Sequence, residues 1–282
     1  MYDYEVISLH VASDPKRTIS TNFFFDSFPA EPSQSMPQDY LFWVIRGEGR
    51  CIIIDTCFSV ESALTRGRQM HRPVEAHLAD LGIIPEEVTD LIMTHLHWDH
   101  AGNIGLFPNA RVHVQAEEVA FCTGSAMLHR AVNKIYDLKD VQSIMLLLFE
   151  GRLNLLDGKK ELFPGISAMK VGGHTPGSQI IQVETARGSI VLASDAAHFW
   201  ANVQRRSPFP ILDSFPQALR AFDCIRTLSG GDLERIIPGH DPLLRKVFPG
   251  LRGHDGATCL HALPLIDVAN TVEDFFKKTA IL

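Results

Sequence analysis

Short apolar runs, separated by turns rich in glycine and proline, recur along most of this chain and predict more strands than helices. Segment 41–56 contains two apolar runs on either side of a Gly-containing turn, a pattern that predicts a β-hairpin. Segment 28–39 holds several prolines and predicts an irregular surface loop. Further strands are predicted within 90–103, 111–115, 153–158, 166–171, 178–184, 188–195 and 235–241.

Fewer segments have the period of a helix. Segment 72–83 has Pro and Gly where helices start and end, and segment 214–228 places apolar residues on one helix face. Helices are also expected in 116–122, in 127–149 and at the end of the chain. The segment 127–149 has two interpretations, a core-packing helix pair or a lid over a site, and packing is favoured.

The predicted strands fall into two groups, each followed by helix, which favours an α/β sandwich of two packed sheets. A dinucleotide-binding fold is disfavoured because no GxGxxG motif follows the first strand. We expect one domain over residues 1–282, with an N-terminal extension at 1–40 and a helical insertion at about 116–150.

Composition excludes some functions. The chain has 282 residues, 45% of them hydrophobic, as expected for a globular protein. Its 26 Lys and Arg against 33 Asp and Glu give a net charge of −7, which argues against nucleic acid or a membrane surface as partner. No apolar run is long enough to span a membrane, the N-terminus lacks signal-peptide features, and the five cysteines form no CxxC motif. We therefore expect a cytoplasmic protein.

Candidate chemistry is concentrated in THLHWDHAGN, residues 94–103, where His95, His97, Asp99 and His100 lie within six consecutive positions. Residues two apart in an extended segment face the same way, so the first three can converge while His100 faces a second centre. A polar surface loop is the alternative. Imidazole and carboxylate favour zinc or a similar divalent metal, and four ligands exceed the need of one catalytic ion, so two adjacent ions are predicted.

Three further candidate ligands each follow a predicted strand. His174 lies in the Gly-rich turn VGGHTPGS, Asp195 follows the apolar run of LASDAAH, and His240 follows Pro-Gly in IPGHD. A single histidine in a turn is usually only solvated. Three such residues in a chain that already has the cluster support a metal site.

The motifs THLHWDHAGN, GGHTPGS, ASDAAH and PGHD, in this order, resemble the signature of the metallo-β-lactamase superfamily. The resemblance implies a four-layer αβ/βα sandwich, with two mixed β-sheets packed face to face, helices outside and metals at the strand ends. It implies that His95, His97 and His174 bind one ion, that Asp99, His100 and His240 bind the second, and that Asp195 bridges them. The implied cofactor is two Zn²⁺, with manganese, iron or cobalt as alternatives.

The resemblance further implies a hydrolase in which a hydroxide between the two ions attacks an ester carbonyl and Asp99 carries a proton to the leaving group. Within the superfamily the chain is most similar to the quorum-quenching lactonases, which open N-acyl homoserine lactones. The implied partner is therefore a small lactone. The nearest alternative is a glyoxalase II-like thioesterase, and a non-catalytic metal- or partner-binding module is the alternative from another class.

His198 is a departure from this branch, because several of its lactonases have a tyrosine three positions after the bridging aspartate. A histidine can still donate a hydrogen bond, so His198 is a candidate catalytic residue, and the substrate stays open between a homoserine lactone and another lactone. Asp55 is predicted to be a structural hydrogen-bonding residue. It precedes Cys57, where the superfamily usually has glycine.

The remaining candidates receive structural interpretations. The histidines outside the motifs are expected to be bystanders: His10, His71, His77 and His129. His113 is expected to point away from the core. Core packing is at least as well supported as pocket lining for the aromatic residues Trp98, Phe199 and Trp200. The apolar segment 23–25 is a candidate to line a pocket or to be buried in a homodimer, and core packing is at least as well supported for its phenylalanines too.

Overall fold

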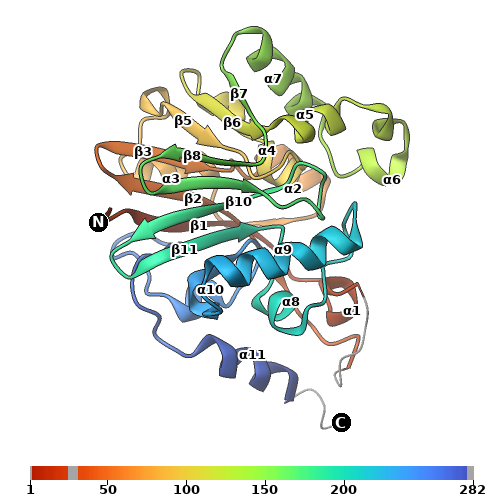
Figure 1. The fold of residues 1–282 in the computed structure, drawn as a ribbon, viewed down its shortest axis with the longest axis vertical. Helices are drawn as coiled ribbons and strands as arrows, with labels where there is room; N and C mark the ends of the chain where they lie inside the picture. Colours follow the sequence, from red (N-terminus) through yellow and green to blue (C-terminus); the bar gives the residue numbers. More distant parts are fainter. Residues whose placement is uncertain (1, 25–30, 278–282) are drawn as a thin grey trace.

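The computed structural model describes residues 2–24 and 31–277 and contains two β-sheets with helices around them (Figure 1). The first sheet has the strand order β13-β1-β2-β3-β5-β6-β7, with β4 paired to β1. Neighbours are antiparallel from β13 to β3 and parallel from β3 to β7. Its strands are β1 (Glu5–Asp14), β2 (Gln38–Gly47), β3 (Arg50–Ile54), β4 (Gln69–Met70), β5 (Asp90–Ile92), β6 (Arg111–Gln115), β7 (Leu153–Leu156) and β13 (Ala257–Cys259).

The second sheet has the strand order β12-β11-β10-β9-β8. Its pairs are antiparallel except for β11 and β12, which are parallel. Its strands are β8 (Lys159–Phe163), β9 (Ile166–Lys170), β10 (Gln179–Thr185), β11 (Gly188–Ser194) and β12 (Ile236–Pro238). Both sheets are therefore mixed, as expected.

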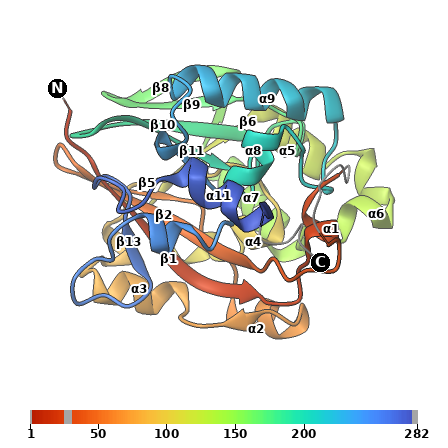
Figure 2. The ribbon, with the colours of Figure 1, turned by 90° about the horizontal axis from the view of Figure 1, so that it is seen from below.

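Helices cover the outer side of each sheet. Figure 2 shows α9 beyond the second sheet and α2 and α3 on the opposite side, beyond the first sheet. The α-helices are α1 (Ile19–Asn22), α2 (Val60–Thr65), α3 (Val74–Asp80), α4 (Trp98–Ala101), α5 (Ala116–Cys122), α6 (Arg130–Asn133), α7 (Leu138–Phe149), α8 (Trp200–Arg205), α9 (Phe215–Leu228), α10 (Leu244–Val247) and α11 (Val268–Lys277). Short 3₁₀ helices are η1 (Pro85–Glu87), η2 (Ile104–Leu106), η3 (Ser125–Leu128) and η4 (Leu233–Arg235).

Strand β2 shows how the sequence produces these layers. Its alternate residues face opposite sides of the sheet. Trp43 and Ile45 enter the apolar cluster shared with the second sheet, whereas Phe42 and Val44 enter the cluster beneath α2 and α3. Both faces are buried, so the strand is apolar without interruption from Tyr40 to Ile45, and the four-layer sandwich follows.

Most predicted elements are found where the pattern placed them. The hairpin of 41–56 is β2 and β3, and segment 127–149 contains the end of η3 together with α6 and α7. The N-terminal residues were expected only as an extension, yet 5–14 form β1, which pairs with β2 and β13 inside the first sheet. Part of the predicted loop at 28–39 lies outside the described residues. Within 2–24 and 31–277, none of the helices combines the length and apolar character that a membrane span requires.

Candidate metal centre

Four of the candidate ligands follow β5 in the first sheet. His95 and His97 lie in the loop after this strand, and the short helix α4 carries Asp99 and His100. Their side chains are buried. Residues 95–100 therefore form a loop and a short helix that leave the first sheet with their polar side chains directed into the protein.

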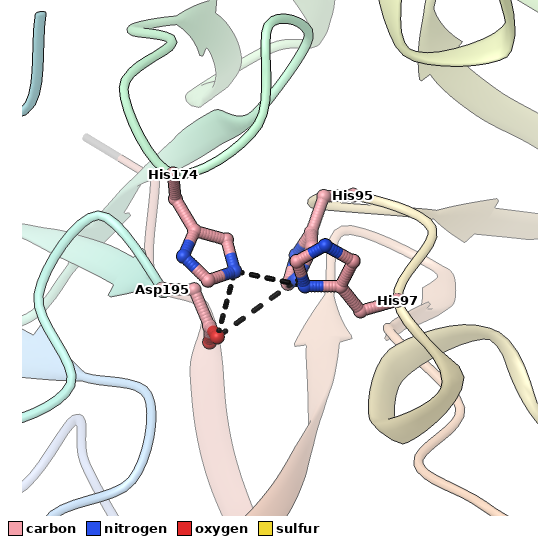
Figure 3. Close-up of side chains that lie close together, drawn as sticks. All are labelled: His95, His97, His174 and Asp195. Carbon is pink, nitrogen blue, oxygen red and sulfur yellow. Dashed lines mark hydrogen bonds and ion pairs between the residues drawn. The ribbon is translucent and has the colours of Figure 1, made fainter. Parts of the chain in front are cut away.

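The other three candidate ligands come from the second sheet. His174 lies between β9 and β10, Asp195 follows β11 directly, and His240 follows β12. Figure 3 shows His174 and Asp195 pointing toward the two histidines of the first loop. Residues from both sheets thus meet at one edge of the sandwich.

The first group of ligand atoms surrounds His97. Its Nδ1 lies 3.1 Å from Nε2 of His95 and 2.9 Å from Nε2 of His174. Oδ2 of Asp195 lies 3.2 Å from His174 Nε2 and 3.8 Å from His95 Nε2. A tetrahedral zinc ion with ligands at about 2.0–2.2 Å requires donor atoms roughly 3.3 Å apart, so this group has the size of a zinc site.

The second group contains Asp99, His100 and His240, whose ligand atoms lie within 4.8 Å of one another. Oδ2 of Asp99 lies 3.9 Å from Nε2 of each histidine. Oδ1 of Asp195 lies 3.1 Å from His100 Nε2 and 2.9 Å from His240 Nε2. The two oxygens of Asp195 therefore face different groups, as a bridging carboxylate would.

Hydrogen bonds behind the histidines direct one ring nitrogen of each toward the centre. Nδ1 of His100 lies 2.8 Å from a carboxylate oxygen of Asp55, and Nδ1 of His174 and His240 lie 2.8 Å and 2.7 Å from backbone carbonyl oxygens. Each Nδ1–H donates outward, which leaves the Nε2 lone pair facing inward. Apart from the N–H of His198, the buried groups that converge here are lone pairs and carboxylates, which fits a cation.

Burial also keeps the first group in the form that binds metal. Desolvation, reinforced by neighbouring histidines, lowers the pKa of His95 and His97 well below the usual value, and burial lowers the pKa of His174. These rings are therefore neutral near neutral pH. Burial opposes ionisation of Asp195, but the surrounding imidazoles outweigh it and hold its pKa well below the usual value.

His198 lies beside the two groups, and it forms a third set with Asp195 and His240, whose ligand atoms also lie within 4.8 Å of one another. Its Nε2 is 3.0 Å from Oδ2 of Asp195, and its ring stacks on Phe209 with centroids 3.7 Å apart. Nδ1 of His198 is buried and has no hydrogen-bond partner. Burial lowers the pKa of His198 to about 3, so the ring is neutral.

Asp55 supports the first loop, as predicted. Its carboxylate accepts hydrogen bonds from the backbone N–H and the hydroxyl of Thr94, both at 2.7 Å, and from His100. The Thr94 hydroxyl, since it donates to Asp55, accepts from Nδ1 of His95 at 3.2 Å. Asp55 and Cys57 both adopt positive φ, 57° and 50°, which explains why glycine suits position 57.

Glu118 is a supporting residue that the sequence patterns did not indicate. One carboxylate oxygen accepts from the backbone N–H of Leu96 at 3.0 Å, and the other accepts from the Thr175 hydroxyl and from Gly177 N–H at 3.2 Å. Leu96 separates two candidate ligands, and Thr175 follows a third. Helix α5 therefore joins both ligand loops, and the only local signal is a glutamate on a helix.

Some structural interpretations need correction and others hold. His113 was expected to point away from the core, but it is buried and pairs with Asp90 at 2.8 Å, so that expectation was wrong. The other histidines outside the motifs lie outside the ligand groups, as expected. Trp98, Phe199 and Trp200 pack in the core. Phe23 is buried, Phe24 is 40% exposed, and residue 25 lies outside the described residues.

Comparison with protein families agrees with this geometry. Residues 39–240, which include all seven candidate ligands, match the model of the metallo-beta-lactamase superfamily. The chain belongs to this superfamily. The resemblance inferred from its four motifs is confirmed.

Curated relatives of the chain include N-acyl homoserine lactonases. N-acyl homoserine lactonase AiiA of Bacillus thuringiensis subsp. kurstaki is 31% identical over 179 residues, which cover 61% of this chain and 64% of the relative. N-acyl homoserine lactonase AttM of Azorhizobium caulinodans is 29% identical over 170 residues, which cover 59% of this chain and 63% of the relative. The matched part thus spans less than two thirds of either relative.

Solved structures of the superfamily have the same fold. A quorum-quenching N-acyl homoserine lactone lactonase superposes with a TM-score of 0.71 at 22% identity, covering 87% of this chain and 95% of that one. The hydrolase AbOPH superposes with a TM-score of 0.64 at 20% identity, covering 91% and 94%. The predicted sandwich of two mixed sheets is therefore confirmed.

Proposed function

We propose that this chain is a metal-dependent hydrolase that opens the ring of a lactone. The observation that carries the proposal is the pair of ligand groups around one shared carboxylate, Asp195, whose two oxygens face different groups. The curated relatives are N-acyl homoserine lactonases, which supports a cyclic ester as the substrate.

The residues proposed to hold two Zn²⁺ are His95, His97 and His174 for one ion, Asp99, His100 and His240 for the other, and Asp195 for both. Such ions, when bound, lower the pKa of a shared water and polarise the ester carbonyl. Manganese, iron or cobalt are the alternatives that the same ligand types accept.

Asp99 is the proposed proton carrier. It is the most exposed of the seven candidate ligands, at 9%, and its Oδ2 lies 3.9 Å from both histidines of its group. A carboxylate in this place can hold a proton and deliver it to the alcohol oxygen that leaves when the ring opens.

His198 is proposed to act on the reaction through Asp195. A neutral imidazole has one donor and one acceptor. Since Nε2 faces the Asp195 carboxylate at 3.0 Å, the N–H is used there and Nδ1 presents an acceptor. His198 therefore orients Asp195 and brings no hydroxyl donor to the substrate, unlike the tyrosine at this position in several lactonases.

A substrate panel with metal analysis on the same sample tests the proposal. The panel contains N-acyl homoserine lactones, simple γ- and δ-lactones and S-lactoylglutathione. We expect lactone opening, about two metal ions per chain, and a fall of about 10²–10⁴-fold in kcat for Asp99→Asn. Asp157→Asn, at a side chain that is 94% exposed, is the matched control and keeps full activity.

Other outcomes separate the alternatives. Turnover of the thioester without lactone opening would favour a glyoxalase II-like thioesterase. Less than one metal ion per chain, or unchanged hydrolysis in His97→Ala, would favour a non-catalytic binding module. The cytoplasmic location and the homodimer stay predictions from the sequence.

A further inference from the structure

Two arginines outside the ligand set, Arg17 and Arg68, lie against aromatic rings that border the candidate metal centre. The guanidinium carbon of Arg17 lies 4.6 Å from the centroid of the Phe209 ring. Phe209 in turn stacks on His198 at 3.7 Å. The charge of Asp99 is one of those that act on Arg17, so the guanidinium lies within electrostatic range of the second ligand group.

Arg68 lies against two other aromatic rings near the candidate ligands, those of Tyr40 and Trp98. Its guanidinium carbon lies 5.7 Å from the Tyr40 ring and 5.8 Å from the Trp98 ring. The ring of Tyr40 lies 5.4 Å from that of His240, and Trp98 sits between two ligands in the sequence. Both arginines therefore border side chains that contact or adjoin the ligands.

The two guanidinium groups have more N–H donors than there are acceptor atoms around them. Within residues 2–24 and 31–277 the carboxylate paired with them is that of Asp14, 2.9 Å from Nη1 of Arg68 and 3.9 Å from Nε of Arg17. Arg17 also donates to the backbone oxygen of Thr21 at 3.1 Å. Nε of each arginine is buried and has no hydrogen-bond partner in the described structure.

A buried donor without an acceptor costs free energy, and so do two positive charges that share one negative charge. Arginine stays charged in proteins, so loss of a proton does not resolve this imbalance. An anion at this place would supply both the missing acceptor and the missing charge. A planar carboxylate suits the fork of donors on a guanidinium group.

We propose that Arg17 and Arg68 form a binding subsite for a carboxylate of the substrate, so that the lactone is an acidic one. This inference rests on the proposed function and narrows its substrate class, since simple N-acyl homoserine lactones carry no charge. A cationic rim also concentrates anionic substrates around a chain whose net charge is −7.

Matched substrates test the subsite on the zinc-loaded protein. One is a γ-butyrolactone that carries a carboxylate on the ring, and the other is its carboxamide, which has the same shape without the charge. We expect the wild type to prefer the carboxylate at least tenfold in kcat/KM, with the preference falling as salt is added. In Arg17→Gln/Arg68→Gln the ratio falls to about two or less.

Two further variants separate charge from folding. Arg17→Lys retains more of the preference than Arg17→Gln, because the charge is kept. Arg206→Gln, at an exposed arginine paired with Asp223, keeps the full ratio. An equal ratio in the wild type and the double variant, or no preference in the wild type, overturns the proposal.

Direct binding decides the matter even when hydrolysis fails. Isothermal titration compares the ring-opened hydroxy dicarboxylate with its monoamide on the zinc-loaded protein. Tenfold tighter binding of the dicarboxylate, lost in the double variant, supports the subsite, while equal binding of both compounds refutes it. Failure of the lactonase proposal appears separately, as absence of turnover of every lactone by protein that holds two metal ions.

Discussion

At the scale of single residues, the hydrogen bonds made by the histidine Nδ1 atoms decide the tautomer and orientation of each candidate ligand. Asp55 is the clearest case, because one carboxylate receives Thr94 through two bonds and His100 through a third. Outer partners of this kind fix the tautomer and orientation of a ligating imidazole. A substitution that changes the hydrogen-bonding capacity of Asp55 should therefore change the metal affinity of the centre.

Asp55→Asn is predicted to weaken zinc binding about 10–100-fold, because an amide can no longer accept all three bonds as a carboxylate does. Asparagine tolerates the positive φ of 57° at this position, so the backbone is expected to stay in place. Competition with a chelating dye measures the zinc affinity. The control is Asp90→Asn, another Asp–His pair at 2.8 Å that lies outside the ligand groups. Equal zinc affinity in the wild type and Asp55→Asn would contradict the prediction.

The seven candidate ligands could be named from the sequence because each belongs to a short motif at a strand end. Glu118 and Arg17 could not, because their significance depends on contacts with residues far away in the chain, such as Gly177 and Phe209. His113 was misjudged for a related reason. The alternation in β6 predicts that His113 faces the opposite side of the sheet from its neighbours. It does not predict that both sides are buried or that Asp90 lies within hydrogen-bond distance of His113.

At the scale of elements, helix α5 approaches the loop of His174 so closely that only glycine fits at position 177. A Cβ on Gly177 would lie 2.5 Å from Cα of Glu118, closer than packed atoms allow. The contact is between backbones, so neither side can move without shifting an element. This close approach lets Glu118 reach Thr175 and hold the loop.

Gly177→Ala is predicted to push α5 away from the ligand loop, lower the free energy of unfolding by about 1–3 kcal/mol and weaken metal binding. Gly105→Ala is the matched control, since a Cβ there meets no atom within 4 Å. Chemical denaturation and metal titration measure the two effects. An alanine at 177 that is as harmless as the one at 105 would show that the contact is looser than described.

Helix α3 is fastened to β1 through a buried histidine. His77 Nε2 lies 3.0 Å from the backbone oxygen of His10, and burial lowers the pKa of His77. His77 therefore stays neutral in the folded protein at pH values near 6.5, where the histidine of the unfolded chain takes up a proton. The stability that neutral His77 provides is present above that pH and is lost as the pH falls below it.

The corresponding prediction compares the wild type with His77→Gln between pH 7.5 and 5.5. The wild type is expected to lose stability faster as the pH falls, so that the difference in unfolding free energy narrows toward pH 5.5. Urea denaturation of the zinc-loaded proteins measures this difference. His129→Gln, at an exposed histidine, serves as control and should follow the wild type. Parallel curves for wild type and His77→Gln would refute the assignment.

Elements whose apolar residues alternate or repeat could be predicted, and β2, β3 and α9 lie where the pattern placed them. The strands β8 and β13 were not predicted, and neither was β1. Its residues Glu5–Asp14 alternate less clearly because both faces are buried, and its place beside β2 depends on pairing with a strand that starts at Gln38. Strand order is a long-range property that local spacing does not contain.

At the scale of the whole molecule, the candidate centre joins the two sheets. The first sheet contributes the loop of residues 95–100, and the second contributes His174, Asp195 and His240. The two apolar clusters on either side of the first sheet are complete without these ligands. Metal binding should therefore add to stability without being required for folding.

Removal of metal by a chelator is predicted to lower the melting temperature by about 5–10 °C, since a ligand at a hundred times its Kd contributes about 2.7 kcal/mol. The metal-free protein should still melt cooperatively. Differential scanning calorimetry before and after chelation measures this, and added zinc should restore the original value. An unchanged melting temperature in protein shown to be metal-free would contradict the cross-sheet centre.

The division of ligands between the sheets also has a consequence for synthesis. His100 leaves the ribosome 140 residues before His240 (240 − 100 = 140). At about 5–20 residues per second this interval is on the order of ten seconds. During that time a nascent chain carries a partial imidazole site whose remaining ligands do not yet exist, and copper binds such sites more tightly than zinc. If the centre binds metal as proposed, the ion recovered with the purified protein would therefore depend also on which ions surrounded the polypeptide while its second half was being made.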